Sequence, residues 1–190
     1  MSLPASLQPL TEPAAGLGLR GHAVAVVDHN PAWATAYKCV ESHLQHSLNE
    51  FNVEIAHIGS TSVPGLVAKP LLDIAVGVRE PFDDQAIIGV LAQAGFRFEA
   101  DLGIYGGLFF VVRPAANVAV AHLHVVDHND FQWRWYLAFR DGLRTSDELR
   151  AEYSALKRAA AEANATNRAG YNKAKFDWVL ATVNALDTVG

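Results

Sequence analysis

The amino-acid sequence predicts an α+β protein, in which a mixed β-sheet is flanked by helices and the C-terminal third is helical. Segments typical of strands are concentrated between residues 22 and 126, whereas helical spacing of apolar residues dominates from residue 130 onward. The length of 190 residues suits one domain, and a content of 51% hydrophobic and 18% charged residues is typical of a folded globular chain. We expect residues 21–190 to form this single domain, after a flexible N-terminal tail at residues 1–20.

Composition and charge narrow the classes of protein to which the chain can belong. The first 20 residues carry three prolines and no basic residue before Arg20, so they do not resemble a secretory signal peptide. No apolar run reaches the roughly 18 residues that a transmembrane helix needs. The formal net charge of −5 gives no support to a general nucleic-acid binder, and the single cysteine, Cys39, allows no intrachain disulfide. These features predict a cytoplasmic protein with no membrane partner and no general affinity for nucleic acids. They leave the oligomeric state open.

The predicted domain begins with a strand at residues 22–28. Asn30 followed by Pro31 then gives the cap and first-turn signal of an amphipathic helix at residues 31–49. The apolar residues of this helix recur at helical spacing: Trp33, Tyr37, Val40, Leu44 and Leu48.

The strand predicted at residues 71–79 should lie in the middle of the sheet, because its sequence is almost continuously apolar, as in strands buried on both faces. A second helix is expected at residues 83–94, where Gly95 is a suitable stop. Further strands are predicted at residues 52–58, 96–100, 107–112 and 117–126.

Three helices are predicted in the C-terminal third, the first at residues 130–143. Thr145 with Glu148 has the capping-box pattern that begins the second helix, which extends to about residue 163. The third should cover about residues 171–187. Its expected buried residues are Phe176, Val179, Leu180, Val183 and Leu186.

The segment that follows the strand at residues 52–58 combines small residues, hydroxyls and a lysine. Gly59 permits a positive φ angle or a close backbone approach. Backbone N–H groups in such a loop can form an anion-binding concavity, and Lys69 adds a point charge suited to phosphate. His57 precedes the loop and is placed to hydrogen-bond it. The hydroxyl-bearing residues of the loop are Ser60, Thr61 and Ser62.

Asp73 lies one residue into the apolar strand that follows this loop. A buried carboxylate is costly without a partner, so Asp73 needs a metal ion, a basic group or hydrogen-bond donors. A purely structural interpretation remains open, in which the loop is an ordinary turn and Lys69 is the ion partner of Asp73. The spacing matches neither a Walker A loop nor the dinucleotide-binding fingerprint.

The segment HIGSTSVPGLVAKPLLDI, residues 57–74, resembles the signature of the GrpB family. That signature typically reads His-Ile-Gly-Ser-Thr-Ser/Ala-Val-Pro-Gly-Leu, then Ala-Lys-Pro, an apolar pair and Asp-Ile. The resemblance covers about residues 22–180. It continues in NPAW at 30–33, HLHV at 122–125, FRDGLR at 139–144, Tyr153 with Leu156-Lys157, and Tyr171 with Lys175.

The resemblance implies a nucleotidyltransferase-like fold. In that superfamily a Gly-Ser or Gly-Gly pair lies beneath a triphosphate, and two acids one residue apart hold Mg²⁺ with a third acid from a neighbouring strand. Gly59-Ser60 and Asp73 occupy the expected places here. Position 75, on the same strand face as Asp73, is alanine, so the second acid is absent.

The third acid of that pattern is also altered, because the corresponding strand carries His122 and His124 on one face. If this strand lies beside Asp73, imidazoles rather than a carboxylate face the site. The catalytic and metal-binding residues expected from the resemblance are therefore Asp73, His122 and His124. The implied cofactor is a divalent metal: Mg²⁺ or Mn²⁺, or a transition metal if the histidines are ligands. Protonated histidines would bind phosphate directly.

Basic residues of the helical third complete the candidate phosphate site. Arg140 and Arg144 are four residues apart and share one helix face, and arginine is suited to bidentate phosphate contacts. An ordinary solvated face is the alternative for any one of them. Because the resemblance places both arginines and Lys157 within family motifs, we expect these three to face phosphate as a set.

Three functions stay open on the sequence. The first is a divergent nucleotidyl or phosphoryl transferase that uses Asp73, residues 59–62 and the two histidines. The second is a non-catalytic module that binds a nucleotide or another phosphorylated small molecule, motivated by Ala75. The occasional fusion of the family to dephospho-coenzyme A kinase associates this module with a coenzyme A-related ligand. The third is a metal hydrolase built on His122 and His124.

Overall fold

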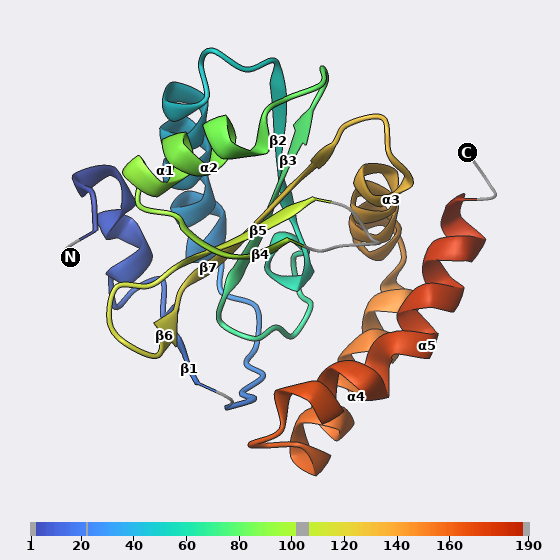
Figure 1. Cartoon of the computed structure of the whole chain (residues 1–190). Coiled ribbons are helices and arrows are strands. Elements are labelled where there is room, and N and C mark those ends of the chain that lie inside the picture. The colour runs from blue at the N-terminus through green and yellow to red at the C-terminus, as the bar shows by residue number, and fades with distance from the viewer. Residues whose placement is uncertain (1–2, 22, 102–106, 188–190) are drawn as a thin grey trace.

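A computed structural model describes residues 3–21, 23–101 and 107–187 of the chain, and it shows a mixed β-sheet with helices on both faces (Figure 1). The main sheet has five strands in the order β2-β3-β7-β5-β4. Only β3 and β7 are parallel, and the other neighbours are antiparallel. The strands are β2 (Val53–Ile58), β3 (Leu72–Val78), β4 (Arg97–Asp101), β5 (Leu108–Val112) and β7 (Ala121–Asp127). The predicted α+β class with a mixed sheet is confirmed.

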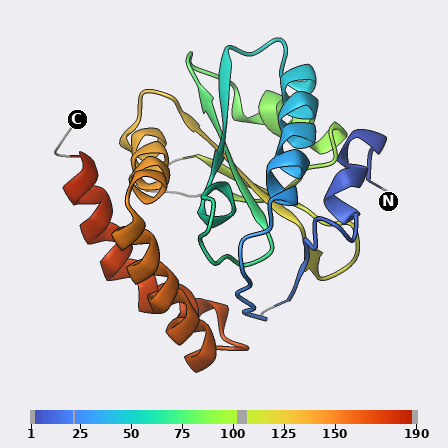
Figure 2. The ribbon, with the colours of Figure 1, turned by 180° about the vertical axis from the view of Figure 1, so that it is seen from behind.

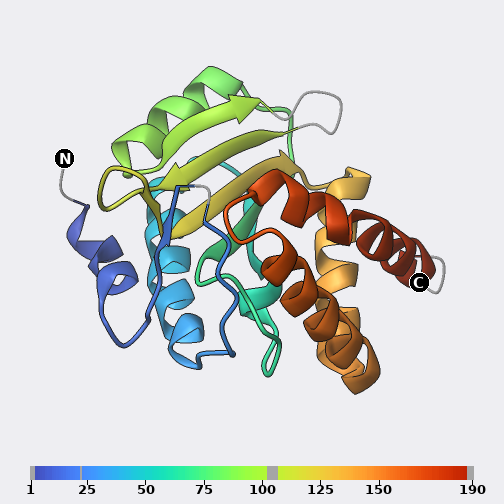
Figure 3. The same cartoon turned by 90° about the horizontal axis from the view of Figure 1, so that it is seen from below.

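Five α-helices surround this sheet in the described part of the chain. Two of them, α1 (Ala32–Ser47) and α2 (Asp84–Gln93), bury apolar residues against one face of the sheet (Figures 1 and 3). On the other face lies α3 (Phe131–Thr145), which packs on β2, β3 and β7. The last two, α4 (Asp147–Ala163) and α5 (Arg168–Asp187), run side by side and pack against α3 (Figure 2). None of the described helices is both long and apolar enough to cross a membrane.

The strand pairing assigns the residues of β3 to two different environments. Leu72, Ile74 and Val76 point into the core that α1 and α2 cover. Asp73 and Ala75 point to the opposite face, where they pair in register with His122 and His124 of β7. All residues of β3 except Asp73 are buried. The prediction of an internal strand buried on both faces is therefore confirmed, and Asp73 is its single polar exception.

The predictions for α1 and α2 hold, whereas the strand predicted at residues 117–126 is divided in two. The five apolar residues predicted to face inward from α1 are all buried. Gly95, with φ +89°, ends α2 as expected. The strand predicted at residues 117–126 is interrupted at Val120, which separates the short β6 (Val118–Ala119) from β7.

The prediction of a flexible N-terminal tail is wrong for residues 3–20. Residues Ala5–Thr11 form a 3-10 helix, η1, that packs against α1. Leu7 and Leu10 are fully buried in the core. They lie three residues apart, which is one turn of a 3-10 helix, so both side chains face the same way. The prolines that favoured a tail instead accompany this turn, with Pro9 inside it.

The strand predicted at residues 22–28 is also corrected. His22 lies outside the described residues, and residues 23–28 contribute only an isolated bridge between Val27 and Ala68. The strand of this region is β1 (Leu19–Arg20), which pairs with β6. The apolar pattern has another cause, because Val24 is buried against Ala160 and Tyr171 of the C-terminal helices.

Two details of the helical third differ from the prediction. Ser146, not Thr145, caps α4, because its side chain accepts a hydrogen bond from Leu149 N. Thr145 is still the last residue of α3, and its hydroxyl donates to Asp141 O. On α5, Phe176 is 56% exposed rather than buried, whereas Tyr171 and Val183 are buried. Only one face of helix α5 packs against the rest of the protein, and Phe176 does not lie on that face.

The N-terminal packing yields a first prediction. Leu10→Ala should lower the free energy of unfolding by about 2–5 kcal/mol, because it removes a fully buried side chain from the core. Glu12→Ala, a change at an exposed position of the same segment, should alter it by about 0.5 kcal/mol or less. Urea denaturation followed by tryptophan fluorescence measures both. Equal, small effects would show that the segment does not pack on the domain in solution.

Candidate functional site

The site is organised by a tight contact between Gly59 and Asp73. Strand β2 ends at Ile58, which pairs in register with Asp73 of β3. Gly59 then adopts φ 65° and ψ −173°, a backbone conformation that is essentially restricted to glycine. A Cβ atom at this position would lie 2.6 Å from Asp73 Oδ2. Both properties predicted for Gly59, the positive φ and the close approach, are present.

The loop after Gly59 begins with a short 3-10 helix, η2 (Ser60–Ser62). His57 Nε2 is hydrogen-bonded to Thr61 Oγ1 at 3.0 Å, as expected for a histidine that supports the loop. The imidazole is buried and stacks on Tyr37, with ring centroids 4.5 Å apart. Burial above all lowers the pKa of His57 to about 4, so it is neutral at pH 7. It acts as a fixed hydrogen-bonding support.

Asp73 has basic groups on more than one side. His122 Nδ1 lies 3.2 Å from Asp73 Oδ1. Burial by itself would raise the pKa of Asp73, but the hydrogen bond to His122 and the charge of Lys69 hold it well below its usual range. The carboxylate is therefore ionised across the physiological pH range. Strand β7 does lie beside β3, so the imidazole of His122 faces Asp73, as expected for adjacent strands.

A small cavity of about 140 Å³ opens beside Asp73, and we call it the lysine cavity. Its basic and aromatic lining comes from Lys69, Phe139, Tyr153, Lys157, Tyr171 and Lys175. Gly59, Ser60 and Thr61 line it from the loop. Six predicted site residues thus meet around one cavity: Gly59, Ser60, Thr61, Lys69, Asp73 and Lys157.

The three ammonium groups of the lysine cavity are incompletely paired. Lys157 is 2% exposed, and its Nζ donates to Val67 O at 2.5 Å. Lys69 Nζ and Lys175 Nζ lie over the Tyr171 ring, 5.4 Å and 4.2 Å from its centroid. Neither of them donates a hydrogen bond to any described residue.

Burial, together with nearby positive charges, lowers the pKa of all three lysines. Burial is the main cause that lowers the pKa of Lys69, and burial with the charge of Lys175 lowers that of Lys157 far below its usual range. For Lys175, burial and the charge of Lys69 lower the pKa to about 8, while Asp73 opposes the shift. The described residues of the cavity lining thus include three basic groups but only one acidic group, Asp73, to balance them.

The Tyr171 hydroxyl, from the lining of the same cavity, lacks a hydrogen-bond partner in the described part of the chain. Tyr171 is fully buried, and its Oη has no hydrogen-bond partner among the described residues. A buried hydroxyl without a partner is costly, and native structures contain few of them. Among the described residues, the Tyr171 hydroxyl, Lys69 Nζ and Lys175 Nζ are thus donors of the cavity lining that have no protein acceptor, whereas Lys157 Nζ has one in Val67 O.

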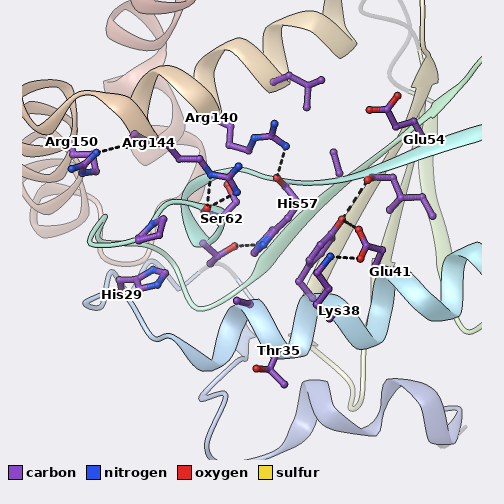
Figure 4. A pocket seen from close by; sticks show the side chains of 17 residues that line it. His29, Thr35, Lys38, Glu41, Glu54, His57, Ser62, Arg140, Arg144 and Arg150 are labelled. Carbon is purple, nitrogen blue, oxygen red and sulfur yellow. Dashed lines mark hydrogen bonds and ion pairs between the residues drawn. The ribbon is translucent and has the colours of Figure 1, made fainter.

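Arg140 and Arg144 lie elsewhere, around a larger cavity of about 840 Å³ between α1, β2 and α3 (Figure 4). Arg144 Nε and Nη2 donate to Ser62 O at 3.1 Å and 2.9 Å, and Arg140 donates to Asp141 and to His57 O. The expected set of Arg140, Arg144 and Lys157 is therefore divided between two cavities. Thr61 lines both, whereas Ser62 lines only the larger one.

His124 and Ala75 do not join the site around Asp73. Ala75 is fully buried in a cluster with Ile58 and Trp133, beneath α3. His124 Nδ1 lies 3.4 Å from Tyr136 Oη, and burial lowers its pKa to about 4. Within residues 3–21, 23–101 and 107–187, no group of three or more His, Cys, Asp or Glu side chains could hold a metal ion. The paired acids of a Mg²⁺ site are not reproduced.

Sequence reasoning did not place Tyr153, Tyr171 and Lys175 in the site. A signal was available for two of them, because Tyr171 and Lys175 are four residues apart and so share one face of α5. The face that α5 turns toward β3 depends on the packing of α4 and α5. Helical periodicity alone does not predict how these two helices pack on the sheet.

Comparisons with known proteins find likenesses that cover most of the chain. A family model described as GrpB protein matches residues 23–184. The UPF0157 protein SCO7215 of Streptomyces coelicolor is 34% identical over 158 residues, which are 83% of this chain and 81% of that protein. The glutamate-rich protein GrpB of Alkalihalophilus pseudofirmus is 29% identical over 177 residues, covering 90% of this chain and 99% of its own. The crystal structure of the conserved protein GrpB from Enterococcus faecalis gives a TM-score of 0.77 at 27% identity, over 87% of this chain and 99% of its own.

The contact between Gly59 and Asp73 gives a second prediction. Gly59→Ala combines a backbone strain of about 1–3 kcal/mol with a collision between the new Cβ and Asp73. Gly65→Ala is the matched control, because Gly65 also has a positive φ, but a methyl group added there would meet no atom within 4 Å. Chemical denaturation should show the larger loss of unfolding free energy for Gly59→Ala. Equal losses would contradict the close contact with Asp73.

A third prediction concerns pH. The folded protein releases the Lys175 proton near pH 8, whereas an unfolded lysine keeps it to about pH 10.5. Between these values the unfolded state binds more protons, so the contribution of Lys175 to stability rises with pH in this window. Lys175→Met should therefore be stabilised relative to wild type below pH 8, and this advantage should shrink toward pH 10.5. Lys173→Met, at an exposed position of α5, should show no such trend in thermal unfolding.

Proposed function

The chain belongs to the GrpB family, and from this premise we propose that it binds the phosphate group of a nucleotide or another phosphorylated small molecule in the lysine cavity. One observation carries the proposal. Three lysines and an unpartnered tyrosine hydroxyl surround a cavity whose lining contains a single carboxylate, Asp73.

Electrostatics supports an anionic ligand in this place. Charged groups that are shielded from water and not fully paired raise the free energy of the folded state. A phosphate group would offer oxygen acceptors to Lys69 Nζ, Lys175 Nζ and the Tyr171 hydroxyl together. Hydrogen bonds between ammonium groups and phosphate are charge-assisted, and they are about twice as strong as neutral ones.

The size of the lysine cavity limits what it can hold. Sites that enclose a whole drug-sized ligand have volumes of about 300–1,000 Å³. The lysine cavity, at about 140 Å³, suits the charged end of a ligand. We therefore propose that it recognises the phosphate and leaves the base or other organic part outside. A coenzyme A-related ligand satisfies this requirement as well as a nucleotide does.

Two roles of the lysine cavity, one catalytic and one not, are distinguished by experiment. In the first, Asp73 serves a nucleotidyl or phosphoryl transfer, with His122 holding the carboxylate in position at 3.2 Å. In the second, the protein binds its ligand without reaction. The burial of Ala75 beneath α3 favours the second role, because no acid accompanies Asp73 on its strand. The histidine-dependent hydrolase gains no comparable support, since His122 and His124 have separate partners.

A thermal-shift screen tests the proposal for binding. ATP, coenzyme A, pyrophosphate and inorganic phosphate should each be compared with the ligand-free protein. A ligand at 100 times its Kd should stabilise the fold by about 2.7 kcal/mol. Lys175→Met and Tyr171→Phe should reduce the shift, whereas Lys173→Met, which removes the same charge from an exposed position of α5, should retain it. An unchanged melting temperature with every ligand would refute the proposal.

The choice between catalysis and binding rests on Asp73→Asn. If the protein is a transferase, it should turn over a nucleoside triphosphate with Mg²⁺ or Mn²⁺, and the variant should lose this activity while thermal unfolding shows that it is still folded. Release of pyrophosphate or phosphate measures the reaction. Stabilisation by nucleotides without turnover in wild type would identify the non-catalytic module.

A further inference from the structure

The residues around Asp73 do not fit the divalent metal that the resemblance implies. A paired-acid site needs a second carboxylate at position 75, on the same face of β3. Ala75 is fully buried there, among Ile58, Val126 and Trp133, with Leu137 of α3 packed against the same cluster. A carboxylate or a hydrated ion would have to displace α3 from the sheet.

Both oxygen atoms of the Asp73 carboxylate already contact the protein. Asp73 Oδ1 is paired with His122 Nδ1 at 3.2 Å. Asp73 Oδ2 lies against the backbone of Gly59, close enough that even a methyl group there would collide with it. Lys69, Lys157 and Lys175 line the same cavity and would repel a cation.

We propose that the lysine cavity binds a phosphate monoester dianion without a divalent metal, with the ammonium groups of Lys69, Lys157 and Lys175 in the place of metal ions. This inference rests on the proposed function and specifies the ligand class of the same cavity. Three ammonium groups against the single carboxylate of Asp73 leave a charge of about +2 when all are ionised. A phosphate monoester carries about −1.5 to −2 at pH 7 and matches this charge.

The arrangement also assigns donors to the phosphate oxygens. Lys157 keeps its bond to Val67 O and has two further N–H donors, since an ammonium group carries three. Lys69 and Lys175 make no hydrogen bond to the described residues, and the Tyr171 hydroxyl has no partner among them. These donors come from the loop before β3 and from α4 and α5. Binding of the dianion therefore links the C-terminal helices to the sheet.

Calorimetric titration of the full-length protein tests the inference. Inorganic phosphate, AMP and cyclic AMP are titrated at pH 7 in buffer with EDTA and in buffer with Mg²⁺. Phosphate and AMP should bind in EDTA with an affinity that Mg²⁺ does not improve. Cyclic AMP, a diester with a single charge, should bind at least about tenfold more weakly than AMP. Lys175→Met should weaken AMP binding about tenfold or more, whereas Lys173→Met should leave it unchanged.

Asp73→Asn distinguishes direct capture from capture through a metal. If the lysines bind phosphate directly, loss of the negative charge should leave AMP binding intact or strengthen it. If a metal mediates the contact, the variant should lose binding. Its thermal unfolding is recorded alongside, and should the variant not fold, the comparison of EDTA with Mg²⁺ on wild type still decides.

The outcomes separate this inference from the proposed function. AMP binding that appears only with Mg²⁺ overturns the metal-free inference and leaves phosphate recognition standing. Equal affinity for AMP and cyclic AMP overturns the assignment to a monoester dianion. Binding of neither phosphate nor AMP in either buffer overturns the proposed function as well.

Discussion

The contact between Asp73 and the backbone of Gly59 is the constraint on which the rest of the site depends. The pairing of β2 with β3 sets it, because Ile58 and Asp73 lie opposite each other where β2 ends. Without a Cβ atom, Gly59 can turn the chain directly beside the carboxylate. The following loop is then held by side chains from three directions: His57 on Thr61, Arg144 on Ser62 and Lys157 on Val67. These contacts fasten the loop to β2, α3 and α4 beside the lysine cavity.

The same loop separates two cavities of different chemistry. The larger one is lined by arginines whose guanidinium groups are already bonded to carbonyl oxygens and to Asp141, so they act as braces of the loop (Figure 4). The lysine cavity has the opposite character, because its ammonium groups and the Tyr171 hydroxyl exceed the acceptors that the protein supplies. Unsatisfied buried donors reduce stability, and native structures contain few of them. The large core beneath α1 and α2 offsets this cost.

Local sequence patterns predicted most of the secondary structure for a clear physical reason. The helical spacing in α1 and the continuous apolar run of β3 each depend on neighbouring residues and on one buried surface. The conformational need for Gly59 and the unusual position of Asp73 were readable for the same reason. The N-terminal 3-10 helix was missed because Leu7 and Leu10 are only two apolar residues in a proline-rich segment. The apolar pattern at residues 22–28 predicted a strand, yet the structure uses it to pack Val24 beneath α4 and α5.

The sequence by itself determined the mixed sheet, the turn at Gly59, the acid at Asp73 in an apolar strand and the absence of an acid at position 75. These are properties of one residue or of one strand. Only the tertiary structure decided that Arg140 and Arg144 hold the end of β2 and the loop on the side of the larger cavity, while Lys157 and Lys175 line the lysine cavity beside Asp73. It also decided that His122 reaches Asp73 whereas His124 turns to Tyr136. Periodicity gives the face of a helix on which a residue lies, but the partner of that face is set by the packing of α3, α4 and α5 on the sheet. That packing joins residues about 100 positions apart along the chain, and no local pattern encodes it.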